Sequence, residues 1–232
     1  MSGCWCRRCW VRADLAALRE AQRDLAARVV RTDALPAPIR HIGGVDVSCS
    51  RFDPTQGVHA VIVVLEWPSL REVARAGVSA TAPLPYLTGL LAFREVPALL
   101  QAFAALSVKP DLLLVDGQGI AHPRRCGIAC HLGVALNLPC IGVAKSRLLG
   151  EAEAPLGAAA GSMVRVLDRG EVVGALLRSR VRANPLHVSI GHRVGLETAL
   201  HWVRASGRGW RLPEPTRLAH EAAAMLRRAT MG

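Results

Sequence analysis

The sequence has 232 residues, and 51% of them are hydrophobic, which is enough for one fairly large α/β domain with a buried core. Its longest apolar stretches, 60–65 and 132–143, are much shorter than the roughly 20 residues of a membrane-spanning helix. No apolar run follows Arg7 and Arg8 as it would in a secretory signal. These features argue against membrane and secreted classes, and we expect a cytoplasmic protein with no membrane partner.

The formal net charge is +11, from 29 basic and 18 acidic residues. An excess of this size attracts polyanions over a long range, so a nucleic-acid partner and a merely soluble basic protein are comparable readings of the charge alone. Nearly every basic residue is Arg, and the only lysines are Lys109 and Lys145. Because Lys145 follows an apolar strand in a chain with this bias, we expect a need for a compact ammonium group there.

Seven cysteines are present, an odd number. Cys4, Cys6 and Cys9 could bind zinc, but no fourth ligand is nearby and the C-x-C-x2-C spacing is unusual. We therefore expect residues 1–10 to be an N-terminal tail and residues 11–232 to form a single domain, with a zinc-binding protein as one alternative. Three further cysteines are better explained as buried apolar residues than as disulfide partners, and these are Cys126, Cys130 and Cys140. Cys126 and Cys130 are expected on one helix.

Hydrophobic periodicity predicts a first helix over 14–31, with Leu15, Leu18, Leu25 and Val29 on its apolar stripe. Three strand-like runs with short, turn-rich links then favour an antiparallel meander. The runs are 39–48, 59–65 and 72–78, and the links are 53–57 and 67–69.

A helix over about 97–106 follows, because Pro97 suits the first turn of a helix. Residues 111–115 are a continuous apolar strand of the buried parallel type. A meander, a helix and a buried parallel strand form the order found in ribonuclease H-like folds. We therefore predict an α/β fold with a ribonuclease H-like mixed sheet flanked by helices. Further helices are predicted at 127–136, 196–205 and 216–228, strands at 140–143, 163–167, 172–177 and 186–190, and a loop at 151–161.

Two carboxylates fall in apolar surroundings. Asp46 lies inside the first predicted strand, and Asp116 ends the buried strand. A charged carboxylate in such a place is costly unless a positive group compensates it. If the two strands are parallel neighbours, both side chains can share one divalent cation, and oxygen ligands favour magnesium. Either aspartate alone is better explained as an ordinary strand-end or turn residue, but the two together in a strongly basic chain favour a metal site. Glu95, just before the helix predicted from Pro97, is explained alone by an acid that offsets the helix dipole.

Six segments resemble the endonuclease V family, and together they extend from His41 to His220. They are HIGGVDVSCS, TAPLPYLTGLLAFREVPALL, PDLLLVDGQGIAHPRRCGIACHLG, LPCIGVAKSRL, LHVSIGHRVGLETA and RLPEPTRLAH. The family often has a second basic residue after its Ala-Lys pair, where this chain has Ser146.

The resemblance implies a catalytic domain whose metal-ligating aspartates are Asp46 and Asp116. It implies that Glu95 binds the metal directly or through water, that His220 completes the acidic site, and that Lys145 lies near the scissile phosphate. The implied cofactor is Mg²⁺, with Mn²⁺ as a possible substitute. The implied chemistry is metal-assisted phosphodiester hydrolysis that leaves a 3′-hydroxyl and a 5′-phosphate.

Tyr86 is the only tyrosine and follows Pro85 in a stiff loop. A rigid aromatic in a loop can separate stacked bases, or it can pack on the core, and the position alone favours neither. The resemblance implies that the Pro85–Tyr86 pair is the wedge and that the expelled base is hypoxanthine. The base pocket would be formed by backbone that lacks bulky side chains, at Gly117, Gly119, His122 and Gly127. A tight strand-to-helix turn explains these glycines equally well.

The predicted function is a DNA repair endonuclease that nicks the strand 3′ to deoxyinosine, with inosine-containing DNA, and possibly RNA, as its partner. An inosine-specific endoribonuclease with the same active site is the alternative, because contacts to the 2′-hydroxyl are not visible in a sequence. A non-catalytic nucleic-acid-binding module is a further reading. A monomer is expected.

Overall fold

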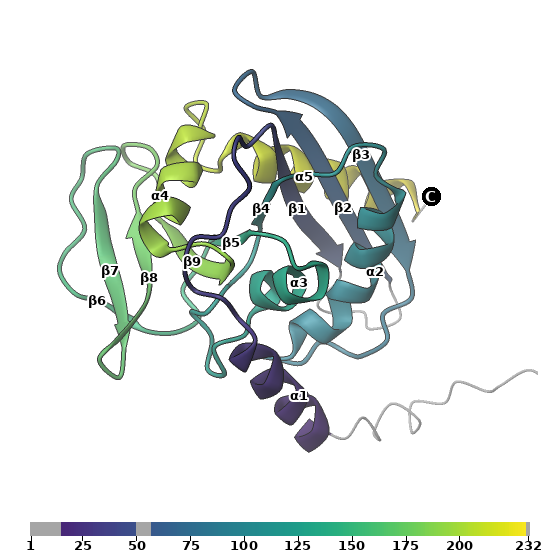
Figure 1. The fold of residues 1–232 in the computed structure, drawn as a ribbon, viewed down its shortest axis with the longest axis horizontal. Coiled ribbons are helices and arrows are strands. Elements are labelled where there is room, and N and C mark those ends of the chain that lie inside the picture. The colour runs from purple at the N-terminus through teal and green to yellow at the C-terminus, as the bar shows by residue number, and fades with distance from the viewer. Residues whose placement is uncertain (1–14, 50–56, 231–232) are drawn as a thin grey trace, which may run out of the picture.

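The computed structural model describes residues 15–49 and 57–230, and it is a mixed α/β structure (Figure 1). The strands are β1 (His41–Cys49), β2 (Val58–Glu66), β3 (Arg71–Ala80), β4 (Leu112–Val115), β5 (Cys140–Ala144), β6 (Glu151–Ala152), β7 (Met163–Asp168), β8 (Glu171–Leu177) and β9 (Leu186–His192). The helices are α1 (Leu15–Ala27), α2 (Leu91–Ala105), α3 (Ile128–Leu136), α4 (Leu196–Ala205) and α5 (Glu214–Ala229).

All nine strands belong to one sheet in the order β3-β2-β1-β4-β5-β9-β8-β7-β6. The first three strands form the predicted antiparallel meander. β1 pairs in parallel with β4, and β4 in parallel with β5, so these three strands end at the same edge of the sheet. The predicted ribonuclease H-like mixed sheet is thereby confirmed.

The side chains of β2 alternate between two apolar layers, as expected of a strand covered on both faces. Ile62 and its face of β2 pack in the cluster that contains residues of α2 and α3. Val61 and Val63 pack instead against Ala219 and Ala223 of α5. Helices α2 and α3 therefore cover one face of this part of the sheet, and α5 covers the other (Figure 1).

Every predicted helix and strand is present within a few residues of its expected bounds, with one large error. The second helix begins at Leu91 rather than at Pro97, which lies inside it. The residues before the proline continue the apolar face of the helix, since Ala92 and Val96 are buried as Leu99 after it is. Glu95 accordingly lies in the second turn of α2 and not before the helix.

Three smaller predictions are also corrected. Cys126 is buried as expected but precedes α3, so it is not on a helix with Cys130. Leu15 is 39% exposed, and the buried residue of α1 is Gln22. The predicted loop 151–161 begins with the two-residue strand β6.

The predicted N-terminal tail, the cluster of Cys4, Cys6 and Cys9, and most of the turn at 53–57 lie outside the described residues. Among the residues that are described, no helix is long and apolar enough to cross a membrane.

Candidate active site

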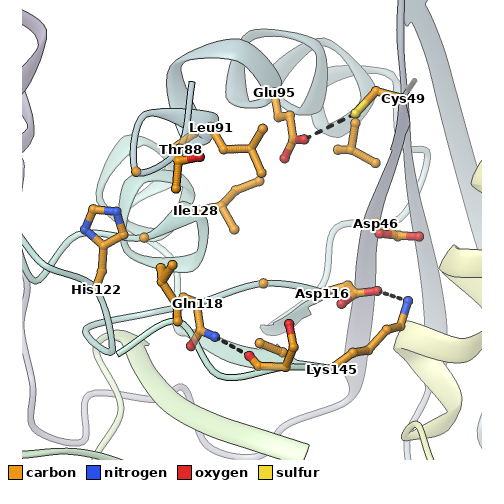
Figure 2. Close-up of a pocket in the computed structure, with 18 of the residues that line it drawn as sticks. Asp46, Cys49, Thr88, Leu91, Glu95, Asp116, Gln118, His122, Ile128 and Lys145 are labelled. Atoms are coloured by element: carbon orange, nitrogen blue, oxygen red, sulfur yellow. Dashed lines mark hydrogen bonds and ion pairs between the residues drawn. The ribbon is translucent and has the colours of Figure 1, made fainter. Parts of the chain in front are cut away.

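A cavity of about 440 Å³ opens where β1, β4 and β5 end, and α2 and the segments after β4 and β5 complete its wall (Figure 2). Acidic side chains lie toward one side of it, whereas His122 and Thr88 lie toward the other. The cavity thus offers one region for a reacting group and another for recognition. The residues predicted from the sequence that line it are Asp46, Tyr86, Glu95, Asp116, Gly117, His122, Gly127, Lys145 and His220.

Asp46 and Asp116 are brought together by the parallel pairing of β1 and β4. Val45 is in register with Val115, so the residue after each occupies an equivalent place at the end of the pair. The Asp116 amide also donates a hydrogen bond to the Val45 carbonyl at 2.9 Å. Carboxylate oxygens of the two aspartates and a ring nitrogen of His220 all lie within 4.8 Å of one another. This donor set fits a divalent cation.

Two side chains, Lys145 and His220, contact this pair. The Lys145 ammonium lies 2.5 Å from Asp116 Oδ2 and 3.2 Å from His220 Nδ1. His220 Nδ1 in turn lies 2.8 Å from Asp46 Oδ2. Burial and the Asp46 carboxylate raise the pKa of Asp116, while the Lys145 ammonium opposes that rise. The expectation of a compact ammonium at this position agrees with the contact that Lys145 makes.

The place of His220 depends on a close approach of α5 to β1. A Cβ atom on Gly44 would lie only 1.9 Å from the Pro215 carbonyl oxygen, so backbone packs on backbone here. Gly44 and Asp46 face the same side of β1, about 6.6 Å apart along the strand. Thr216 and His220 are separated by four helical residues, or about 6 Å. The contact at Gly44 therefore sets His220 opposite Asp46.

Glu95 reaches the cavity from α2 and is 6% exposed (Figure 2). It lies outside the group of Asp46, Asp116 and His220 whose ligand atoms are within 4.8 Å. Its Oε1 accepts a hydrogen bond from the Cys49 thiol, with 3.9 Å between sulfur and oxygen. Burial first, and then the Asp46 carboxylate, raise the pKa of Glu95 to about 8. A carboxyl group in this environment is protonated at neutral pH until a positive charge arrives.

Tyr86 stands on the rim of the cavity and is 38% exposed, whereas its neighbour Pro85 is not part of the wall. His122 is buried, and burial followed by the charge of Arg124 lowers its pKa to about 4. Its Nδ1 accepts a hydrogen bond from the Arg124 amide at 3.2 Å. A neutral imidazole therefore lies at the recognition side of the cavity.

The glycines of the predicted base pocket pack closely against the protein itself. A Cβ atom on Gly119 would lie 1.9 Å from the Ile190 carbonyl oxygen, and one on Gly127 would lie 2.2 Å from the Gln118 carbonyl oxygen. Both positions thus serve the tight turn after β4, and Gly119 does not line the cavity. Gly127 lines it with its backbone.

Gln118 and Gln22 line the cavity but were not predicted from the sequence. The Gln118 side-chain amide donates to the Ser146 carbonyl at 2.9 Å, which joins the segments after β4 and β5. The Asp-Gly-Gln-Gly sequence at the end of the predicted strand could have indicated Gln118 as a residue of the site. Gln22 could have been identified as a polar side chain among the apolar residues of the first predicted helix.

A mixed sheet with two carboxylates at the ends of parallel strands defines a metal-dependent hydrolase with a ribonuclease H-like fold. A sequence model described as Endonuclease V matches residues 23–221. The chain is 52% identical over 210 residues to an Endonuclease V of Gloeobacter violaceus, covering 90% of this chain and 85% of the relative. The chain therefore belongs to the endonuclease V family.

Solved structures agree with this assignment. The crystal structure of an Endonuclease V from Streptomyces avermitilis has a TM-score of 0.88 and 38% identity, covering 96% of both chains. The Ciona intestinalis Endonuclease V, solved in complex with a 24mer DNA that contains an inosine followed by a ribo-adenosine, has a TM-score of 0.81 and 28% identity. That similarity covers 93% of this chain and 98% of the Ciona chain.

Proposed function

We propose that the chain is a magnesium-dependent endonuclease that nicks DNA 3′ to deoxyinosine and leaves a 3′-hydroxyl and a 5′-phosphate. The observation that carries the proposal is the pairing of Asp46 and Asp116 at the ends of β1 and β4, with Lys145 and His220 in contact with them. The inosine-containing DNA bound by the Ciona relative supports the choice of substrate.

Asp46 and Asp116 are the proposed magnesium ligands, with His220 completing the set, and Mn²⁺ is a chemically similar substitute. Such an ion, when bound, polarises a phosphoryl oxygen and activates water for attack on the phosphodiester. Glu95 is the proposed third acid, acting directly or through water, because its carboxyl group faces the same cavity. The Lys145 ammonium contributes positive charge beside the scissile phosphate.

Recognition is assigned to the opposite side of the cavity. Its volume of about 440 Å³ lies in the range of ligand pockets, roughly 300–1,000 Å³, and accommodates a nucleobase. The exposed Tyr86 at the rim, in the loop with Pro85, is placed to separate stacked bases as one of them leaves the helix. The neutral His122 and the backbone of Gly117 and Gly127 are the proposed walls for hypoxanthine, with Gly119 supporting the turn behind them.

Cleavage of inosine in RNA is a second candidate. The DNA bound to the Ciona relative has a ribo-adenosine directly after its inosine, so that relative accepts a ribonucleotide beside the recognised base. Discrimination between the two sugars depends on contacts to the 2′-hydroxyl.

The test uses four labelled duplexes of the same sequence, with inosine or adenosine at one position in DNA or in RNA. Each is incubated with the purified full chain in Mg²⁺ or in EDTA, and Asp116→Asn is the matched catalytic control. We expect nicking 3′ to the inosine of DNA, in Mg²⁺ only, and not by the variant. Cleavage of only the RNA duplex would replace the DNA substrate, and equal cleavage of inosine and adenosine strands would remove inosine recognition.

A further inference from the structure

Helix α1 is tied to the walls of the cavity through one buried side chain. Gln22 is 1% exposed and is the buried residue of this helix. Its side-chain amide donates to the Cys126 carbonyl at 2.6 Å, and its carbonyl oxygen accepts from Arg124 Nε at 2.5 Å. Arg124 also donates to the Gly89 carbonyl at 2.6 Å, close to the loop of Tyr86. Helix α1 is thus held beside both loops of the recognition side.

Two exposed arginines of α1 lie next to Gln22 and its hydrogen bond with Arg124. Helical residues are about 100° apart around the axis, so Arg19 and Arg23 lie about 60° and 100° from Gln22, toward one flank of α1. The acids of the helix, Glu20 and Asp24, lie farther round at about 160° and 200°, on the solvent side. Arg124 donates its Nε–H to Gln22, so its guanidinium group lies beside the turn of α1 that carries Arg19 and Arg23. Burial, followed by the charges of these two arginines, lowers the pKa of Arg124.

The described part of the chain forms no ion pair with this group of arginines. Within residues 15–49 and 57–230, none of Arg19, Arg23 and Arg124 forms an ion pair with a carboxylate. Like charges four residues apart on a helix are destabilising by a few tenths of a kcal/mol. An anion on this flank of α1 would relieve the repulsion among the three guanidinium groups.

We propose that Arg19 and Arg23 on α1, next to Arg124, bind backbone phosphates of the strand whose base enters the cavity. The proposal rests on the proposed function for the identity of the strand. Arginine suits this task because its planar guanidinium group donates two parallel hydrogen bonds to a phosphate. The Cβ atoms of residues four apart on a helix are about 5–6 Å apart, so the long side chains reach neighbouring phosphates of one strand.

The test compares the double variant Arg19→Gln/Arg23→Gln with the charge-matched control Arg165→Gln/Arg169→Gln. Arg165 and Arg169 belong to β7 and its following turn, several strands away from β4 in the sheet. Binding of inosine-containing duplex DNA is measured over a range of salt concentrations, with Asp116→Asn added to every protein so that the strand stays intact in Mg²⁺. The single-turnover rate at saturating enzyme is measured without that addition.

We expect the α1 variant to lower the slope of log K against log salt by about 1.8, since each lost phosphate contact contributes about 0.9, and to weaken binding roughly tenfold or more at 0.1 M salt. Its single-turnover rate should equal that of the unmodified protein, and Arg19→Lys/Arg23→Lys should restore most of the slope. An unchanged slope overturns the proposal. An equal loss in the β7 control also overturns it, because net charge alone would then explain the effect.

A duplex without inosine separates this proposal from the proposed function. Phosphate contacts do not depend on the base, so the α1 variant should lose the same slope on that duplex. If the unmodified protein does not prefer inosine, the proposed function fails while the slope still decides the role of α1. If it prefers inosine and the slope is unchanged, the role of α1 fails alone.

Discussion

Substitution of Gly44 by alanine tests how the position of His220 is determined. The new Cβ would lie 1.9 Å from the Pro215 carbonyl oxygen and 2.7 Å from the Thr216 amide nitrogen, and both neighbours are backbone atoms that cannot rotate away. An ordinary carbon–oxygen contact requires the start of α5 to move by roughly 1.5 Å. His220 would move with it, away from its 2.8 Å contact with Asp46.

The cost follows from what α5 buries. Ala219, Ala222 and Ala223 pack on β2, and a loosened helix forfeits much of this contact. At about 0.8 kcal/mol for each buried methyl group, the free energy of unfolding falls by about 2–3 kcal/mol. For a domain of this size the loss corresponds to a Tm lower by about 5–10 °C. A displacement of about 1 Å in a catalytic group reduces turnover roughly 100-fold.

Thermal unfolding and single-turnover cleavage of inosine-containing DNA measure the two effects, and Gly43→Ala is the matched control. Gly43 is the preceding residue of β1, and its Cβ would meet the Leu113 Cδ2 atom at 2.5 Å, the end of a side chain that can rotate. We expect a loss of about 1 kcal/mol and near-normal turnover in that variant. If Gly44→Ala behaved like Gly43→Ala in both assays, close packing of α5 on β1 would not be what places His220.

Three other substitutions address the remaining parts of the site. Asp116→Asn should abolish nicking. It should change the free energy of unfolding by less than about 1 kcal/mol, because the ion-pair partner Lys145 is partly exposed to solvent. Retained turnover would exclude Asp116 as a metal ligand. Because the folded-state pKa of Glu95 is raised to about 8, the metal-free protein should lose stability as the pH rises from about 5 to about 8, and urea unfolding of Glu95→Gln should show a flatter profile. Tyr86→Ala should weaken binding of inosine-containing DNA by roughly tenfold, because one stacking contact with a base is lost. The Mg²⁺ concentration needed for the half-maximal rate should not change. Unchanged binding would argue against a role of Tyr86 as a wedge.

The sheet and one carboxylate pair could be predicted from the sequence because their signals are local. The apolar run 111–115 reads as a buried parallel strand, and the strand order of the predicted ribonuclease H-like sheet puts the strand that contains Asp46 beside it. Once both strands are parallel neighbours, the pairing of Asp46 and Asp116 follows from the register alone. The resemblance to a family added nothing to this step.

His220 and Glu95 could not be identified from local pattern. His220 is 174 residues from Asp46 in the chain, and the docking of α5 on β1 depends on missing volume at Gly44, which no periodicity reports. Glu95 was misplaced because Pro97 is a strong signal for a helix start, whereas burial of the preceding apolar residues extends the helix beyond it. For both residues the family motifs supplied the interpretation that local physics did not.

The segment from Arg211 to His220 shows why one short motif can affect both aspartates of the proposed metal site. The Arg211 guanidinium group donates to the Lys145 carbonyl at 2.7 Å and to the Pro185 carbonyl at 3.1 Å, which fixes the chain where Lys145 leaves β5. Pro215 packs on Gly44, and His220 then meets Asp46. One end of the segment thus holds the cation that faces Asp116, and the other provides the group that faces Asp46. Because the side chains that face both aspartates depend on the same ten residues, displacement of that segment disturbs the contacts of both aspartates together.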